Sequence, residues 1–242
     1  MNKSNNKENE KKIRLLIVDD SFFMRKLLKK MLEKHPFIEV VGDAKDGVEA
    51  IEQMIRLRPD VVTMDYNMPN MNGAQAIKEI IKLLPQNPPR IIMLSAYTEE
   101  GTRATLESLH AGAVDFIVKP SGELSLDIKK IENELVLKIK VAARARVVVS
   151  QSIKLNLKVE RDFKREVDVV IIGSSTGGPP LIENILKQMP KDCAIPIVVV
   201  QHLPEGFCGT MSRKINDIVD INVKEAEDGE ELLPGNAYLA CV

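Results

Sequence analysis

Five short apolar runs alternate with amphipathic stretches between Ile13 and about Arg146. Continuously apolar strands are typical of parallel sheets that are covered by helices on both faces. The predicted strands are Arg14–Val18, Val40–Asp43, Val61–Asp65, Arg90–Ser95 and Asp115–Val118. Helices are predicted to begin near Phe22, Gly47, Ala74, Glu99 and Ser125. This alternation predicts an α/β fold with a doubly wound, flavodoxin-like parallel sheet of five strands.

Polar residues follow these strands at the edge where such sheets bind ligands. Asp19 and Asp20 follow the first strand, and Asp65 ends the third. Three clustered carboxylates repel one another unless a divalent cation neutralises them, and oxygen ligands suit Mg²⁺. Ser95 and Lys119, at the ends of the fourth and fifth strands, are predicted to contact a phosphoryl group. Asp65 is the predicted acceptor, because a carboxylate can attack phosphorus to form an acyl phosphate.

Each of these residues also has an ordinary structural interpretation. An Asp after a strand often caps a helix, and a Lys-Pro pair is often only a turn. Their combined occurrence at the ends of separate strands favours the phosphoryl site. The segment from Ile13 to about Lys140 resembles the receiver domain of two-component response regulators, on the motifs Asp19-Asp20, Asp65-Tyr66-Asn67-Met68-Pro69 with Gly73, Ser95-Ala96 and Lys119-Pro120.

The resemblance implies phosphorylation of Asp65 by a histidine kinase. It also implies that Asp19 or Asp20 binds Mg²⁺ together with Asp65, and that the backbone carbonyl of Asn67 completes the protein ligands. Phe116 occupies the family's aromatic switch position, with Phe in place of Tyr. A cis peptide before Pro120 is implied as well.

Composition excludes several classes of partner. The 34 Lys and Arg residues balance 35 Asp and Glu residues, so no net charge favours nucleic acid or a membrane surface. Residues 1–12 are polar, without a signal peptide or membrane anchor, so we expect a disordered leader, a cytoplasmic location and no membrane insertion. The three cysteines, Cys193, Cys208 and Cys241, lack metal-ligand spacing and suit a reducing compartment better than a disulfide framework. No chemistry is assigned to them.

A second strand, turn and helix begin after a basic, polar stretch. The predicted organisation is a leader (1–12), a receiver domain (13–140), a linker (141–166) and a partial second α/β domain (167–242). The apolar run Val167–Ile172 leads into Gly173-Ser174-Ser175-Thr176-Gly177, which matches the Gly-x-Ser-x-Gly nucleophile elbow and selects Ser175. The amides at the helix start are predicted to hold an oxyanion, although such a turn alone more often binds a simple anion.

A histidine closes the next apolar run. His202 follows the predicted strand Ile195–Val200, where it would lie beside Ser175 and accept its proton. The second part of the chain resembles the catalytic domain of chemotaxis protein-glutamate methylesterases, on the motifs Gly173-Ser174-Ser175-Thr176-Gly177-Gly178-Pro179, Gln201-His202-Leu203-Pro204 with Gly206-Phe207, Glu225-Ala226-Glu227-Asp228-Gly229-Glu230 and Leu233-Pro234-Gly235. The order of receiver, linker and esterase is that of the family too.

This resemblance implies hydrolysis of glutamate methyl esters, and deamidation of glutamines, on methyl-accepting chemoreceptors. Ser175 would be the nucleophile and His202 the general base. The family's catalytic Asp lies in a downstream segment that this sequence lacks, so we expect a C-terminally truncated esterase with weak or absent activity. Glu205, Asp217 and Asp228 do not occupy the position of that Asp. The truncated domain is also expected to expose the apolar faces and edges of its strands.

Two functional hypotheses follow. The first is an enzyme in which the unphosphorylated receiver covers the Ser175–His202 cleft and phosphorylation of Asp65 favours an open form. The second is a non-catalytic receiver, a phosphate sink or binding module for a chemotaxis histidine kinase, that carries a broken esterase domain. A DNA-binding response regulator is not supported, because no basic recognition helix follows the receiver.

Overall fold

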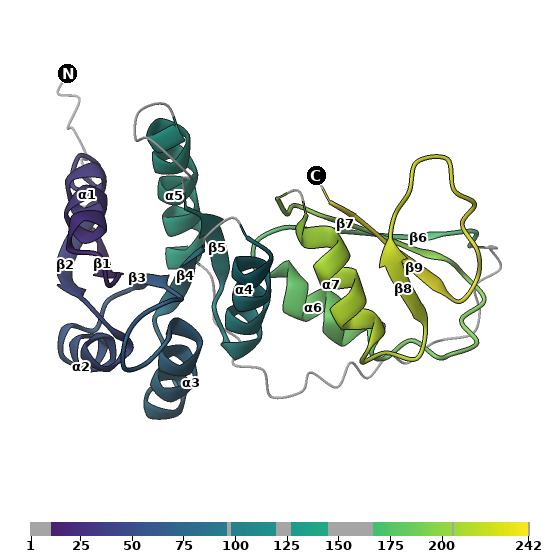
Figure 1. Ribbon diagram of the computed structural model, residues 1–242, viewed down its shortest axis with the longest axis horizontal. Coiled ribbons are helices and arrows are strands. Elements are labelled where there is room, and N and C mark those ends of the chain that lie inside the picture. Colours follow the sequence, from purple (N-terminus) through teal and green to yellow (C-terminus); the bar gives the residue numbers. More distant parts are fainter. Residues whose placement is uncertain (1–10, 96–97, 120–126, 145–166, 205, 242) are drawn as a thin grey trace, which may run out of the picture. The chain divides into compact units, whose positions relative to one another are not determined.

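The computed structural model describes residues 11–95, 98–119, 127–144, 167–204 and 206–241. The chain forms two compact units, each with its own parallel sheet (Figure 1). The expected leader lies almost wholly outside the described residues. So does most of the expected linker, from residue 145 to residue 166.

The first sheet has five parallel strands in the order β2-β1-β3-β4-β5. Its strands are β1 (Ile13–Val18), β2 (Ile38–Ala44), β3 (Val61–Asp65), β4 (Arg90–Ser95) and β5 (Asp115–Val118). The predicted bounds of β3, β4 and β5 are confirmed, while β1 and β2 begin slightly earlier than predicted. The doubly wound fold is therefore confirmed for this unit.

Five helices connect or follow these strands: α1 (Phe22–Leu32), α2 (Gly47–Leu57), α3 (Gly73–Leu83), α4 (Glu99–Ala111) and α5 (Asp127–Arg144). Ser21, Asp46 and Asn72 cap the first three by accepting a backbone N–H in the first turn. Helix α5 continues to Arg144, and so extends into the stretch that was expected to be linker.

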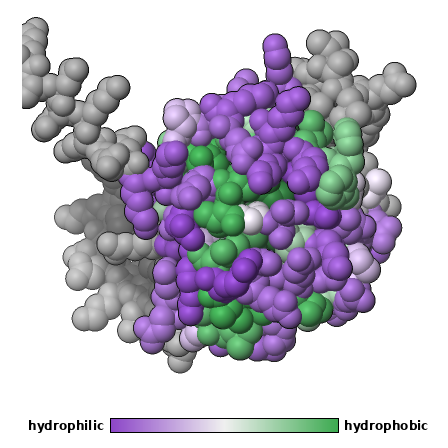
Figure 2. All heavy atoms as spheres, turned by 90° about the vertical axis from the view of Figure 1, so that its left-hand side faces the viewer, coloured by the Kyte–Doolittle hydropathy of each residue, from purple (hydrophilic) through white to green (hydrophobic). Residues whose placement is uncertain are grey.

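The core of this unit lies on both sides of the central strands. Leu15, Leu16, Ile17 and Val18 of β1 are each 0% exposed, which confirms that the strand is covered on both faces. Fully burying one such aliphatic side chain contributes about 1.5–3 kcal/mol. The outer face that carries α1 and α2 is mainly hydrophilic, with separate apolar patches (Figure 2). The core therefore holds the strand ends, and the polar site that follows them, in a rigid frame.

The second sheet has four parallel strands in the order β6-β7-β9-β8. They are β6 (Val170–Ser174), β7 (Ile197–Gln201), β8 (Asn222–Glu225) and β9 (Asn236–Cys241). Helix α6 (Gly178–Leu186) packs on β6 and β7, and α7 (Phe207–Asn216) packs on β8 and β9. This second α/β layer structure agrees with the prediction of a partial α/β domain.

Strand β6 lies at an edge of this sheet and exposes apolar side chains. Ile171 is 67% exposed and Val170 is 39% exposed. The expected exposure is therefore present at β6, whereas β7 has a neighbour on each side and a half-buried pattern. None of the helices in the described ranges is both long enough and apolar enough to cross a membrane.

Candidate functional sites

A lysine bridges two carboxylates at the carboxyl ends of the first sheet. Nζ of Lys119 lies 2.9 Å from Oδ2 of Asp19 and 2.9 Å from Oδ1 of Asp65. The backbone N–H of Ser21 donates to Oδ1 of Asp19 at 2.9 Å, and that of Tyr66 donates to Oδ1 of Asp65 at 2.8 Å. The three side chains follow β1, β3 and β5, and the structure brings them together as the sequence predicts.

Asp20 completes a group of three carboxylates. Asp19, Asp20 and Asp65 each offer an oxygen within 4.8 Å of the other two. Asp19 is fully buried and Asp65 is 7% exposed, whereas Asp20 lies open to solvent. Hard oxygen ligands with room for several waters are what Mg²⁺ prefers. The donor set therefore fits a Mg²⁺ site typical of receiver domains.

The electrostatics of this cluster favour added positive charge. Burial raises the pKa of Asp65, the attraction of Lys119 opposes that rise, and the charge of Asp19 adds to it. Burial would lower the pKa of Lys119, but the carboxylates of Asp65 and Asp19 together raise it. Lys119 thus stays charged at neutral pH. Keeping the buried Asp65 carboxylate ionised costs free energy, and a bound cation would reduce that cost.

Of the other predicted phosphoryl and switch residues, Ser95 ends β4 at the same end of the sheet, whereas Phe116 is the second residue of β5 and lies opposite Met93. Ser95 is 2% exposed, and its carbonyl accepts the N–H of Lys119 at 2.6 Å. Phe116 in β5 is 4% exposed, so its ring is buried. The backbone carbonyl of Asn67, in the loop after β3, remains a predicted metal ligand. Pro120, with its expected cis peptide, lies outside the described residues.

Two neighbouring strands place the predicted nucleophile and base at one edge of the second sheet. Ser175 follows β6 and His202 follows β7, and both are exposed. Ser174 lies opposite Gln201 in the parallel register, and the N–H of His202 donates to the carbonyl of Ser174 at 3.1 Å. Within the described residues, no hydrogen bond joins the Ser175 hydroxyl to the His202 ring.

Gln201 ties the two segments together. Its Nε2 donates to the carbonyl of Ser175 at 3.1 Å and to the carbonyl of His202 at 3.2 Å. The side chain is 1% exposed, and Oε1 has no hydrogen-bond partner among the described residues. In the sequence, Gln201 stands out only as part of the motif Gln201-His202-Leu203-Pro204. The sequence feature that could have identified Gln201 is a polar residue at the end of a wholly apolar run. Such a residue is expected to be a buried amide that makes structural hydrogen bonds.

The turn after Ser175 requires glycine at two positions. Gly177 has φ of 73°, which is left-handed, and it caps α6. A β-carbon at Gly178 would overlap the Ser174 hydroxyl and Oε1 of Gln201. The close approach is thus at Gly178, one residue beyond the Gly-x-Ser-x-Gly motif, whereas a β-carbon at Gly173, the first glycine of the motif, would meet nothing within 4 Å.

The prediction that the start of α6 offers several free backbone amides is wrong. The N–H of Gly178 donates to the carbonyl of Ser175 at 2.9 Å, and Pro179 and Pro180 have no N–H. Of the four orphan amides that a helix start usually has, α6 leaves at most that of Gly177. An oxyanion at Ser175 would depend on the turn more than on the helix.

Comparisons with known proteins identify a family for each of the two parts of the chain. Residues 15–129 match the response regulator receiver domain, and residues 170–241 match the CheB methylesterase family. The chain is 47% identical over 232 residues to the protein-glutamate methylesterase/protein-glutamine glutaminase of Thermotoga maritima, covering 94% of this chain and 66% of that protein. It is 41% identical over 238 residues to the Oceanobacillus iheyensis protein of the same description, covering 95% and 67%. The chain belongs to the CheB family.

A solved structure supports the same assignment for the first unit. The response regulator domain of Thermotoga maritima CheB is 50% identical, with a TM-score of 0.51, over 56% of this chain and 99% of that domain. The chain spans about two thirds of the length of the full-length CheB relatives. The sequence match thus establishes the family. It covers only part of the length of the related enzymes.

A triad acid is not formed in this CheB-family chain by the residues described. No carboxylate among them accepts a hydrogen bond from the ring of His202. Asp217 ends α7, Asp228 lies in the loop between β8 and β9, and neither contacts His202. Glu205 lies outside the described residues.

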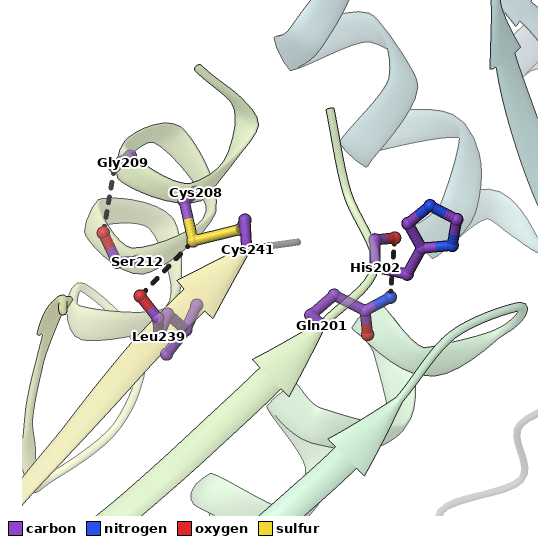
Figure 3. The surroundings of a disulfide bond; sticks show 7 residues. All are labelled: Gln201, His202, Cys208, Gly209, Ser212, Leu239 and Cys241. Atoms are coloured by element: carbon purple, nitrogen blue, oxygen red, sulfur yellow. Dashed lines mark hydrogen bonds between the residues drawn. A yellow bond between two sulfur atoms is a disulfide. The ribbon is translucent and has the colours of Figure 1, made fainter. Parts of the chain in front are cut away.

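The expectation that the cysteines form no disulfide is wrong for two of them. Cys208, in the first turn of α7, is bonded to Cys241 at the end of β9, with 5.8 Å between their Cα atoms (Figure 3). Cys193 is free. The two bonded residues are 33 apart in the sequence, and the packing of α7 on β9 brings them together. Their spacing alone therefore carried no signal.

Proposed function

We propose that this CheB-family chain is a phosphorylation-regulated protein-glutamate methylesterase and protein-glutamine glutaminase. A chemotaxis histidine kinase would donate a phosphoryl group to Asp65, and methyl-accepting chemoreceptors would be the substrates. The observation that carries the proposal is the placement of Ser175 and His202 on adjacent strands and their connection through Gln201.

The receiver chemistry is assigned to the carboxylate cluster. Oδ1 of Asp65 is engaged by Tyr66 and Lys119, so we assign the attack on phosphorus to Oδ2. Asp19, Asp20, Asp65 and the Asn67 carbonyl would hold Mg²⁺, which supplies charge neutralisation at the phosphoryl oxygens. Lys119 would turn from the carboxylates to the bound phosphoryl group, and Ser95 would hydrogen-bond it.

The esterase chemistry is assigned to the second sheet. Oγ of Ser175 attacks the ester carbonyl while His202 accepts the hydroxyl proton. His202 then returns that proton to the departing methoxide, so methanol leaves and a glutamyl ester of Ser175 remains. Water activated by the same histidine hydrolyses that ester to the free glutamate. For a glutamine substrate the leaving group is ammonia.

The alternative is a receiver without catalysis, and one observation favours it. The phosphoryl site is assembled, whereas no carboxylate orients His202 among the described residues. In a serine protease the loss of the triad Asp lowers turnover by about 10⁴-fold. We therefore expect a low basal rate from this chain.

The deciding experiment measures methanol release from methylated chemoreceptor, with and without a small acyl phosphate and Mg²⁺. Release that rises on phosphorylation supports the enzyme. A chain that becomes phosphorylated on Asp65 but releases no methanol above buffer is the phosphate sink instead. Absence of both reactions contradicts both hypotheses.

Mg²⁺ is expected to raise the melting temperature of the receiver unit. Binding to the folded state alone at ten times the dissociation constant stabilises it by about 1.4 kcal/mol, or a few degrees. Asp65→Asn removes one metal ligand and the negative charge that burial disfavours. Mg²⁺ should therefore raise the melting temperature of this variant much less. Differential scanning calorimetry measures both. Asp192→Asn, an exposed site in the other unit, is the control that should retain the full shift.

Gln201→Ala is expected to lower turnover at least about tenfold without a matching rise in KM. The variant removes two hydrogen bonds that hold the Ser175 and His202 backbones, each contributing about 0.5–1.5 kcal/mol. Methanol release and thermal unfolding are the measurements. Gln188→Ala, at an exposed glutamine that bonds only its own helix turn, is the matched control. Equal turnover in both variants would show that Gln201 does not position the site.

A further inference from the structure

The Cys208–Cys241 bond ties the end of the short loop after His202 to β9. In the register of β7 and β9, Gln201 lies opposite Cys241. The chain leaves β7 at Gln201, continues through His202 and returns at Cys208, which is bonded to Cys241. Figure 3 shows His202 beyond the end of β7 and the disulfide between α7 and the end of β9. The same residue, Cys241, thus anchors both ends of the loop.

Cys241 is the more exposed of the two bonded cysteines. Cys208 is 2% exposed, and Cys241 is half-buried. Both line a cavity of about 360 Å³ together with Leu203, Gly206, Glu225 and Leu239. Cavities of about 300 Å³ or more hold small ligands. An attacking thiolate can therefore approach Cys241 through this cavity without unfolding the unit.

In the reduced protein, the Cys208 thiol would have a hydrogen-bond acceptor. Sγ of Cys208 lies 3.4 Å from the carbonyl oxygen of Leu239. In the disulfide that sulfur carries no hydrogen, whereas the thiol of reduced Cys208 can donate to this oxygen. Reduction therefore leaves the buried sulfur with a hydrogen-bond acceptor, and both redox states are compatible with the surrounding structure. Cys193 lies near the start of β7 and takes no part.

We propose that Cys208 and Cys241 are a redox modification site that controls the loop carrying His202, with a small-molecule disulfide of the glutathione class as co-reactant. One cysteine thiolate attacks the small disulfide, forms a mixed disulfide and releases one small thiol. The second cysteine thiolate attacks the protein sulfur of that mixed disulfide and releases the second small thiol. The pair loses two electrons and two protons, and the co-reactant takes them up as two thiols.

Oxidation fixes the end of the loop at Cys208 to β9 by a covalent bond. After reduction the loop is held by packing and by hydrogen bonds such as those from the N–H of His202 to the carbonyl of Ser174 and from the N–H of Phe207 to the carbonyl of Pro204. The exchange of backbone amides reports local opening of this kind. We expect the peptide that spans His202–Phe207 to exchange hydrogen for deuterium about tenfold faster in the reduced protein. The amides of β1 in the other unit should not change.

The test uses the full chain after equilibration with oxidised or with reduced glutathione. Maleimide labelling followed by mass spectrometry should find one reactive cysteine in the oxidised form, since two of the three are bonded, and three in the denatured reduced form. Three reactive cysteines after oxidation would overturn the proposal. So would equal hydrogen exchange of the loop in the two forms.

Variants separate the pair from the third cysteine. Cys193→Ser should keep the full redox response, and Cys241→Ser should remove it. Cys208→Ser should also remove the redox response. If that substitution of a buried residue impairs folding, the comparison of oxidised and reduced wild type still tests the proposal without any substitution. These measurements do not require esterase activity. Failure of the redox proposal is therefore distinguishable from failure of the proposed function.

Discussion

Asp65→Asn is expected to abolish the acyl phosphate that we expect the wild-type chain to form with a small phosphodonor and Mg²⁺. The amide cannot attack phosphorus as a carboxylate does, and the other oxygens of the cluster belong to residues that we assign to the metal. Lys119 keeps its contact with Asp19 in the variant, because that bond of 2.9 Å does not involve Asp65. The expected loss is complete, because the group that would accept the phosphoryl group is removed. Intact-mass spectrometry after incubation with acetyl phosphate measures the added phosphoryl group.

Two further variants make this result specific. Asp20→Asn removes a proposed metal ligand but leaves the acceptor, so labelling should be slower and should still occur. Asp192→Asn changes an exposed carboxylate in the other unit and should label like the wild type. Labelling of Asp65→Asn at the wild-type level would place the acceptor elsewhere and remove the receiver chemistry from Asp65.

The first unit was predictable from the sequence because its strands are covered on both faces. Runs such as Ile91–Leu94 are apolar without interruption, and such runs have few alternatives to a buried strand. Parallel strands also carry their carboxyl ends to one edge, so residues that follow them must meet there. The cluster of Asp19, Asp65 and Lys119 follows from this topology, and the structure confirms that the three side chains converge.

The second unit was less predictable because its site depends on register. The predicted strand Ile195–Val200 located His202, but β9 lies between β7 and β8, which no local pattern indicates. The bond between Cys208 and Cys241 depends on that position of β9, and the bridge made by Gln201 depends on the pairing of β6 with β7. The prediction of free amides at the start of α6 was wrong for a local reason. Pro179 and Pro180 are visible in the sequence, and proline has no backbone N–H.

Ser175→Ala is expected to reduce methanol release to the background rate, whereas Ser174→Ala should retain activity within about tenfold. Both serines occur in the Gly173–Gly177 turn, and the motif alone selects the second. Ser174 is the last residue of β6, and its carbonyl accepts the N–H of His202, which alanine preserves. Ser175 is the exposed residue in the turn beyond the strand. The removal of a nucleophile eliminates the covalent route altogether.

The pair of variants also distinguishes chemistry from folding. Acyl phosphate formation at Asp65 and the melting temperature should be the same in both, because neither hydroxyl contributes to the receiver unit. If Ser174→Ala is the inactive variant, the nucleophile has been assigned to the wrong serine. If both variants release methanol like the wild type, the hydrolysis uses another group, and the Gly-x-Ser-x-Gly match does not mark the nucleophile of this chain.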